Sequence, residues 1–385
     1  MEEKRSVYLD HNATTPLHPE VWKAMEEFSQ RRWGNPSSIH HFGRRAKEAL
    51  EEARDVFAKA LCAHSSELVF TSGGTESANL ALRGAAYAKQ NQGRHILASA
   101  VEHPAVLQTL RALQKEGFEL TLIPVDQYGR VDLDFLKDHL RSTTILVSVM
   151  AANNEVGTLQ PLKEIGELLE KSGALFHTDA VQALGKIPVS PQKWRVDLLS
   201  ASSHKLNGPT GAGLLYVRKG TKLSPLFHGG GQEFGLRRGT ENLLGIVGFA
   251  QAMRVHRKLL EQGEIDRLAS LTQSLRKGIN DLAVPTRINT PLQGALPNTL
   301  NVAFLGRSNE QILFYLDSCG IAVSGGSACS SQSAKPSHVL LAMGLSRKEA
   351  LSSLRFSFGL NNTQEDVDYV LEKLQTFLQT PRQIR

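Results

Sequence analysis

Apolar and polar positions alternate along this chain in two recurring periods. Short apolar runs such as LVFT (68–71) and ALFHTDA (174–180) are typical of strands. Longer stretches between them, such as RRAKEALEEARDVFAKAL (44–61), carry apolar residues at the three- and four-residue spacing of amphipathic helices. Because the two patterns alternate over about residues 65–220, we predict a mainly parallel sheet with helical crossovers, an α/β fold.

A second, smaller set of elements follows a long predicted helix. LPNTLNVAFLG and SSLRFSFG are predicted strands, NEQILFYLDSCG lies between them as a helix, and EDVDYVLEKLQTFL closes the chain. A chain of 385 residues is long enough for one large core and one smaller core. We predict a large domain over residues 16–255 and a small domain formed by residues 1–15 and 256–385.

Composition narrows the class of protein. The chain is 41% apolar and 21% charged, as in soluble globular proteins, and its net charge of +6 comes from scattered Lys and Arg, which does not indicate nucleic-acid binding. No apolar run approaches the length of a membrane span, and MEEKRS is no signal segment. Three cysteines are too few for a disulfide framework or a zinc site. We therefore expect a cytoplasmic protein without a metal, in which a free thiol is available for chemistry.

Two apolar runs near the middle of the chain each lead to a charged residue. ALFHTDA leads to Asp179, and VDLLSASSHK ends at Lys205. Ligands of open parallel sheets bind beyond the carboxyl ends of strands, so these side chains are predicted to share one crevice. Pyridoxal phosphate needs such a pair, a lysine amine to hold its aldehyde and a carboxylate to keep its ring nitrogen protonated. Gln182 is expected on the same side of the turn after Asp179.

A predicted phosphate pocket adds weight to this interpretation. An isolated strand-end Asp is usually a helix cap, and an isolated Lys is usually a solvated charge. In ELVFTSGGTESANLAL, however, a strand runs into Gly74 and Thr75 at the start of a helix, whose N–H groups and dipole favour an anion. Ser202 and His204, before a glycine-rich stretch, are predicted to complete the pocket.

Two further residues each have two possible roles, and a third is expected to form a turn. His103 follows a strand and precedes Pro104, so it is either a helix cap or an imidazole that stacks on a pyridine ring and moves protons. Arg355 in SSLRFSFG is either a surface charge or a two-pronged clamp for a carboxylate. Asn35 in GNPSS has a turn as its default role.

The three cysteines differ in their surroundings. Cys329 lies among glycines and serines without apolar periodicity, which predicts an exposed loop and favours a reactive role as a thiolate. Cys62 lies in an apolar run, KALCAH, and is expected to be a buried structural residue. Cys319 ends a predicted helix and is expected to pack.

Taken together, HTDAVQALG, SSHKLNGPTG, EHPAV, GSACSS and RxSxG resemble the motifs of the pyridoxal-phosphate cysteine desulfurases, in the class V aminotransferase superfamily, over nearly the full length and in the family order. The resemblance implies the fold-type I architecture and pyridoxal 5'-phosphate as cofactor. It also implies removal of sulfur from L-cysteine, which gives L-alanine and an enzyme persulfide on Cys329. This sulfur would supply iron–sulfur clusters, other sulfur-containing cofactors or tRNA modification.

The resemblance further assigns roles to individual residues. The implied catalytic residues are Cys329, Lys205 and His103. The implied cofactor-binding residues are Gly74, Thr75, His103, Asn154, Asp179, Gln182, Ser202, His204, Lys205 and Thr240. The implied substrate-binding residues are Asn35, Asn154 and Arg355. Thr240 is expected to reach the phosphate of a neighbouring subunit, which implies a homodimer with composite active sites, and a sulfur-acceptor protein is the expected partner.

Three alternatives stay open at this point. A selenocysteine lyase has similar motifs, and replacing Cys329 by Ala would distinguish it. A class V aminotransferase would form a keto acid instead of alanine. A non-catalytic scaffold that docks sulfur-transfer proteins would not bind the cofactor and would be colourless. The expected acceptor is an iron–sulfur scaffold or a sulfur carrier. Family members that feed the general iron–sulfur scaffold carry a C-terminal extension that QTFLQTPRQIR does not match, so a nitrogenase-type or dedicated partner and tRNA-modifying machinery also stay open as acceptors.

Overall fold

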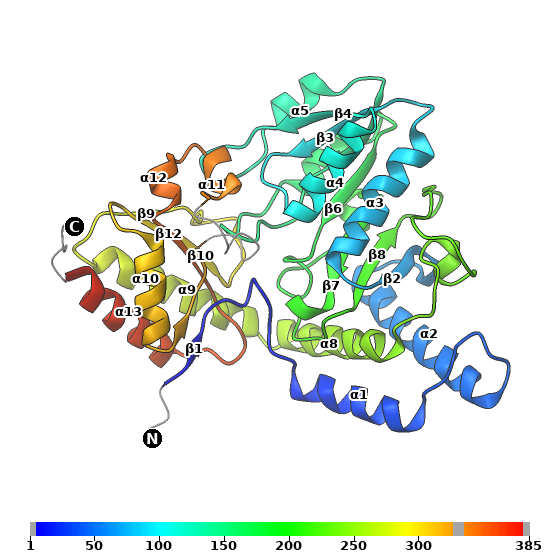
Figure 1. The fold of residues 1–385 in the computed structure, drawn as a ribbon, viewed down its shortest axis with the longest axis horizontal. Helices are drawn as coiled ribbons and strands as arrows, with labels where there is room; N and C mark the ends of the chain where they lie inside the picture. The colour runs from blue at the N-terminus through cyan, green and yellow to red at the C-terminus, as the bar shows by residue number, and fades with distance from the viewer. Residues whose placement is uncertain (1–4, 326–334, 380–385) are drawn as a thin grey trace.

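The computed structural model describes residues 5–325 and 335–379. A seven-stranded sheet forms the centre of the larger lobe (Figure 1). Its strands lie in the order β2 (Leu68–Thr71), β8 (Gly213–Val217), β7 (Leu198–Ser202), β6 (Leu175–Asp179), β5 (Thr144–Ser148), β3 (His95–Ser99) and β4 (Glu119–Ile123). Only β8 runs against its neighbours, β2 and β7, and the other pairs are parallel. The prediction of a mainly parallel sheet is confirmed.

Helices cover both faces of this sheet because its strands are apolar on both sides. Leu198 packs with side chains of α3 and α4, whereas Leu199, next along β7, packs with those of α2, α6 and α8. The helices of this lobe are α1 (Pro19–Arg31), α2 (His41–Leu61), α3 (Gly74–Lys89), α4 (Pro104–Lys115), α5 (Leu133–His139), α6 (Leu162–Leu169), α7 (Pro191–Trp194) and α8 (Leu243–Glu261). Short 3-10 turns lie at Ser65–Glu67, Ser203–Lys205 and Glu233–Gly235.

The smaller lobe contains two further sheets and a hydrophobic core of its own. Its strands are β1 (Val7–Tyr8), β9 (Thr286–Ile288), β10 (Thr299–Phe304), β11 (Ile321–Ala322) and β12 (Ser353–Ser357), with β10 antiparallel to β9 and β12, and β1 parallel to β11. Its helices are α9 (Glu264–Asp281), α10 (Asn309–Ser318), α11 (His338–Ala342), α12 (Arg347–Ala350) and α13 (Gln364–Gln379). The N-terminal strand therefore joins the smaller lobe, as predicted (Figure 1).

The two lobes are joined by the α8–α9 connection and by a shared apolar cluster. Gly263, with a φ of 78°, separates α8 from α9, and the helices on either side of it contribute to different cores. We propose that the two domains divide between residues 255 and 256. Beside the sheet, Val101 and Val156 of the larger lobe pack with Val339 and Leu340 of α11. The start of α11 is thus held against the larger lobe.

The prediction for Cys62 is wrong. This residue is exposed at the C-cap of α2, where its φ of 52° places it in the left-handed region. The apolar run ends one residue earlier, at the buried Leu61. Cys319 packs at the edge of the smaller core, as expected. Among the helices of the described segments, none is long and apolar enough to cross a membrane.

Candidate active site

A pocket of about 240 Å³ lies beyond the carboxyl ends of β6 and β7. It brings together most of the predicted site residues: Gly74, Thr75, His103, Asn154, Asp179, Gln182, Ser202, His204, Lys205 and Arg355. Asn35 and Thr240 do not line it; Asn35 instead accepts a hydrogen bond from the Ser37 amide and forms a turn. Cys329 lies outside the described residues.

Lys205 is held in the pocket by the N-terminal segment of the chain. It ends the 3-10 turn that follows β7, and its Nζ donates to the carbonyl oxygens of Asn12 (2.7 Å) and Ala13 (2.5 Å). Thr15 fastens the same segment, because its amide and its hydroxyl both donate to the His204 carbonyl oxygen. The segment from the smaller lobe therefore orients the lysine amine at the pocket.

Asp179 supplies a buried carboxylate at the end of β6. One of its oxygens accepts a hydrogen bond from the Val181 amide at 2.9 Å. Burial raises the pKa of Asp179, and the positive charges of His103 and Lys205 oppose that rise. A buried carboxyl group of this kind is stabilised in its ionised form by a nearby cation. The protonated ring nitrogen of pyridoxal phosphate would provide that cation, so the residue fits the group.

His103 is the helix cap that the sequence allowed, and it also lines the pocket. It is the N-cap of α4, where its Nδ1 accepts a hydrogen bond from the Ala105 amide at 3.1 Å. Burial lowers the pKa of His103, so the neutral ring is favoured near neutral pH. Since Nδ1 accepts, the proton of that neutral ring resides on Nε2. The ring can therefore donate from Nε2 or take up a second proton.

The opposite end of the pocket suits a phosphate. The first turn of α3 has no side-chain cap, so its amides are available to an anion. A Cβ at Gly74 would lie 2.7 Å from a Val181 methyl carbon, so only glycine lets the helix start at this place. Burial and then the charge of Lys205 lower the pKa of His204 to about 4, so its ring is neutral there. Donors from Ser202 and Thr75 complete a site that fits a phosphate.

Arg355 is a buried clamp, not a surface charge. Its side chain is 1% exposed, with Nη2 2.5 Å from an oxygen of Asp10 and Nη1 donating to the Asn154 carbonyl oxygen at 3.0 Å. Because Arg355 also lines the pocket, its guanidinium lies ready for a second carboxylate. The apolar run TTILVSVMAANN predicts a strand that ends at Asn154, but β5 ends at Ser148 and Asn154 lies in the loop after it, so this prediction is wrong.

Sequence reasoning missed two buried groups beside the pocket. Glu102 is fully buried, and burial together with the charge of Asp179 raises its pKa well above the usual range. One oxygen of Glu102 accepts from the Met150 amide at 2.5 Å. Lys186 is also buried and contacts Gln182. Glu102 directly precedes His103 in the sequence, and Lys186 follows Gln182 by four residues. Of these two positions, only the four-residue spacing indicated a contact between side chains.

The described residues on either side of Cys329 are attached beside the pocket. On the N-terminal side, Ser324 exchanges two backbone hydrogen bonds with Arg355 (2.7 and 3.1 Å). On the C-terminal side, His338 Nε2 lies 2.9 Å from the Glu102 carbonyl oxygen, and Ser337 donates to Glu155 at 2.5 Å. The described residues that precede and follow the predicted cysteine segment are therefore held next to this pocket.

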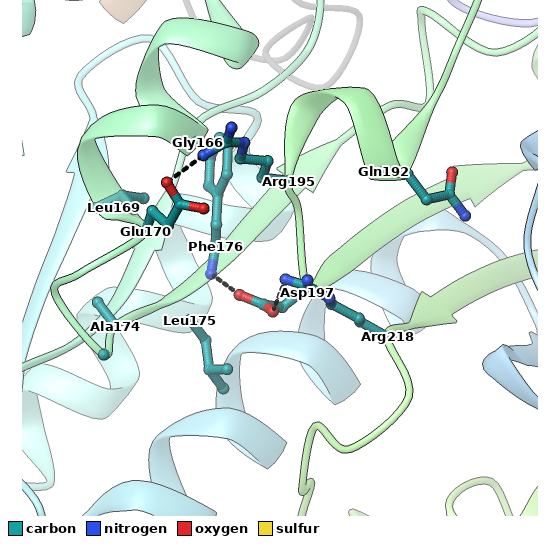
Figure 2. A pocket seen from close by; sticks show the side chains of 11 residues that line it. Gly166, Leu169, Glu170, Ala174, Leu175, Phe176, Gln192, Arg195, Asp197 and Arg218 are labelled. Carbon is teal, nitrogen blue, oxygen red and sulfur yellow. Dashed lines mark hydrogen bonds and ion pairs between the residues drawn. The ribbon is translucent and has the colours of Figure 1, made fainter.

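A larger cavity, of about 520 Å³, lies at the amino ends of β6 and β7. Figure 2 shows that its charged side chains point at one another: Arg195 at Glu170, and Arg218 at Asp197. Its charges are thus used in ion pairs within the cavity wall. In the part of the chain that the structure describes, no group of three or more His, Cys, Asp or Glu side chains could hold a metal ion.

The smaller pocket supplies the amine, the carboxylate and the anion site that pyridoxal phosphate requires, at the carboxyl edge of a mainly parallel sheet. The molecule is therefore a pyridoxal-phosphate enzyme of fold type I. The aminotransferase class-V family matches residues 7–370, and the chain belongs to this family.

Known proteins extend this assignment. A cysteine desulfurase IscS of Dictyoglomus turgidum is 49% identical over 382 residues, which cover 99% of this chain and 96% of that protein. The solved structure of a NifS-like protein is 41% identical with a TM-score of 0.91, over 97% of this chain and 99% of that one. The structure of SspA in complex with cysteine is 34% identical with a TM-score of 0.80, over 92% and 99%.

These findings confirm the predicted family, fold class, cofactor and enzyme class, a cysteine desulfurase. They do not favour selenocysteine lyase or an aminotransferase activity as the alternative. The roles of the individual pocket residues stay predictions.

Proposed function

We propose that this enzyme takes the sulfur of L-cysteine onto Cys329 and releases L-alanine. The observation that carries the proposal is the position of the Lys205 amine, held at one pocket with Asp179, His103 and Arg355. Bound pyridoxal phosphate supplies an electrophilic carbon for an amine and an electron sink for the substrate's α carbon. The residues around the cofactor then have to bind and orient the substrate and to exchange protons with it.

Binding of the substrate carboxylate is assigned to Arg355 and Asn154. The guanidinium already holds one carboxylate, that of Asp10, through a single short contact. Its remaining donors can form the paired hydrogen bonds that arginine makes with a carboxylate. Such a clamp orients the amino acid, which selects α-amino acids over simple amines. Asn35 is a further proposed contact, although it forms a turn away from the pocket in the single chain.

Proton transfer is assigned to Lys205 and His103. Lys205 would hold the cofactor, and with the substrate bound its free amine would be the base that takes the proton from the α carbon. His103 is neutral near neutral pH because burial lowers its pKa, so it can accept a proton and return it. Asp179 would hold a proton on the ring nitrogen of the cofactor, and Gln182 would donate to the ring oxygen.

The sulfur step is assigned to Cys329. Its thiolate forms a bond to the substrate sulfur while the carbon–sulfur bond breaks, and the electron pair returns to the substrate carbon, which takes up protons to become the alanine methyl group. The attachment of both flanking segments beside the pocket supports this assignment. An acceptor protein then removes the persulfide sulfur and restores the thiol; the pathway that it serves is left open.

The experiment is mass analysis of cysteine-containing peptides after brief exposure of the holoenzyme to L-cysteine. We expect the Cys329 peptide to gain one sulfur atom, with an equivalent amount of alanine released. Peptides of Cys62 and Cys319 are internal controls and should stay unchanged, and a Cys329→Ala variant should form no alanine. Sulfur on Cys62 alone, or a keto acid in place of alanine, would contradict the proposal.

We also propose a homodimer with composite sites. Thr240 is exposed and does not line the pocket of its own chain, which is the arrangement expected of a residue that serves a neighbouring subunit. Sedimentation should give a dimer, and Thr240→Val should weaken cofactor binding without changing the dimer mass. A monomer with full cofactor affinity would contradict this proposal.

A further inference from the structure

A second lysine lies buried behind the pocket wall. The side chain of Lys186 is 6% exposed, and its Nζ donates to Gln182 Oε1 at 2.8 Å and to Asn12 Oδ1 at 3.1 Å. Within residues 5–325 and 335–379, its hydrogen-bond partners are these two amide oxygens, and no carboxylate forms an ion pair with it. A buried cation without a carboxylate is uncommon, which indicates a role for this amine.

The environment of Lys186 disfavours its charge. Burial, and then the positive charges of Lys205 and Arg355, lower the pKa of Lys186 to about 7. Burial, and to a smaller extent the field of Lys186, lowers the pKa of the nearby His11 and His256 rings. The amine donates hydrogen bonds in both of its protonation states, so its contacts with the two amides persist when its charge changes.

The contact determines which way the Gln182 amide faces. In its protonated form Lys186 has three donors and no acceptor, so the atom of Gln182 that faces it is the oxygen; in its neutral form its two N–H donors suffice for the two amide oxygens it contacts. Gln182 Nε2 is then turned to the other side, where it donates to the Asn12 carbonyl oxygen at 2.9 Å. That carbonyl oxygen is the one that also accepts from Lys205 Nζ. The donor end of Gln182 therefore lies on the side of the reactive lysine.

We propose that Lys186 is a positioning residue that acts through Gln182. It holds the amide oxygen of Gln182 away from the pocket, so that the N–H of Gln182 that is not used by the Asn12 carbonyl oxygen can face a ligand in the pocket. This inference rests on the proposed cofactor site. A lysine-to-methionine change would leave Gln182 Oε1 buried without its donor, which favours rotation of the amide. The pocket wall would then present a carbonyl oxygen where it had presented a donor.

The test is a pH titration of the visible absorption of the bound cofactor in the holoenzyme. A donor near the ring oxygen stabilises the deprotonated form of the bound group and lowers the midpoint of the absorption change. We expect Lys186→Met to raise that midpoint by about one pH unit. Lys193→Met, at an exposed lysine in the following helix α7, is the matched control and should keep the wild-type midpoint.

A double-variant cycle separates action through Gln182 from a direct effect of charge. If Lys186 acts through this amide, the midpoint of Lys186→Met combined with Gln182→Leu equals that of Gln182→Leu alone. Additive shifts would overturn the inference in favour of a direct field, and an unchanged midpoint in folded Lys186→Met would overturn it outright. If Lys186→Met does not fold, Lys186→Leu is judged by the same two outcomes. A wild-type protein that binds no cofactor would instead contradict the proposed function.

Discussion

The two cavities at opposite ends of β6 and β7 differ in how their charges are arranged. The larger one, of about 520 Å³, is lined by arginines that contact carboxylates of the same wall (Figure 2). The smaller one, of about 240 Å³, is lined or flanked by ionisable groups whose pKa values burial has shifted. A choice of active site by cavity volume alone would select the larger cavity, which the predicted site residues do not line.

This difference has a physical origin in burial and in the direction of the strands. Side chains of Glu170 and Arg195 are 61% and 39% exposed, so water screens their charges and their pairing is weak. Asp179, Glu102 and Lys186 are removed from water, so each one's protonation depends strongly on its neighbours. Shifted pKa values of this kind cluster at functional sites. The carboxyl edge of the sheet is therefore where we place the proposed chemistry.

The largest effect is expected from Lys205→Ala. Without this amine the cofactor is not held covalently and the α proton has no base, so the rate of alanine formation from L-cysteine should fall by at least roughly 10²–10⁴-fold. Arg195→Ala, in the larger cavity, is the matched control and should keep the wild-type rate. Near-normal turnover by Lys205→Ala would place the chemistry elsewhere.

Next in size is the loss of the carboxylate clamp in Arg355→Lys. Lysine keeps the charge but cannot form the paired hydrogen bonds, so KM for L-cysteine should rise by roughly 10- to 100-fold while kcat changes little. Cysteamine, which lacks the carboxylate, is the control substrate, and its kcat/KM should be nearly the same in both enzymes. An equal loss for both substrates would show that Arg355 does not bind the carboxylate.

A smaller effect is expected from Glu102→Gln, in the pH dependence of stability. Burial raises the pKa of Glu102 in the folded protein well above that of an ordinary glutamate, so between these two pKa values the folded protein binds more protons than the unfolded chain. The free energy of unfolding therefore decreases as pH rises through this window, and the substitution removes that loss. Relative to the wild type, the Tm of the variant should gain about 1–2 °C between about pH 5 and pH 8.

The matched control for this prediction is Glu26→Gln, at an exposed glutamate of α1. Its Tm difference from the wild type should stay constant over the same pH range. A constant difference for Glu102→Gln as well would mean that Glu102 is ionised in the folded protein.

The smallest effect is expected in the larger cavity. Arg218→Ala removes an ion pair whose arginine side chain is 55% exposed, and pairs of this kind contribute about 0.2–1 kcal/mol. The free energy of unfolding should decrease within that range, and the part of its salt dependence that comes from this ion pair should be lost. The rate of alanine formation should be unchanged. A marked loss of turnover would remove the contrast between the two cavities.

Much of the larger lobe could be predicted because its signals are local. The apolar run at 68–71 coincides with β2, and the run before Asp179 coincides with β6. The end of a strand at an aspartate or a lysine involves only a few adjacent residues, so it can be recognised from the sequence. Parallel strands then bring such ends to one edge of the sheet. These two features were enough to predict the pocket and its cofactor.

Burial and long-range contacts were decided only by the tertiary structure. The sequence did not indicate that Lys186 is buried or that Cys62 is exposed, since both lie at the end of local patterns and their environment depends on packing. Nor could it place Asn12 against Lys205, because 193 residues separate them. The periods and turn residues of the sequence determined the elements and the chemical groups; the packing of the smaller lobe's first segment over the sheet decided which of those groups meet.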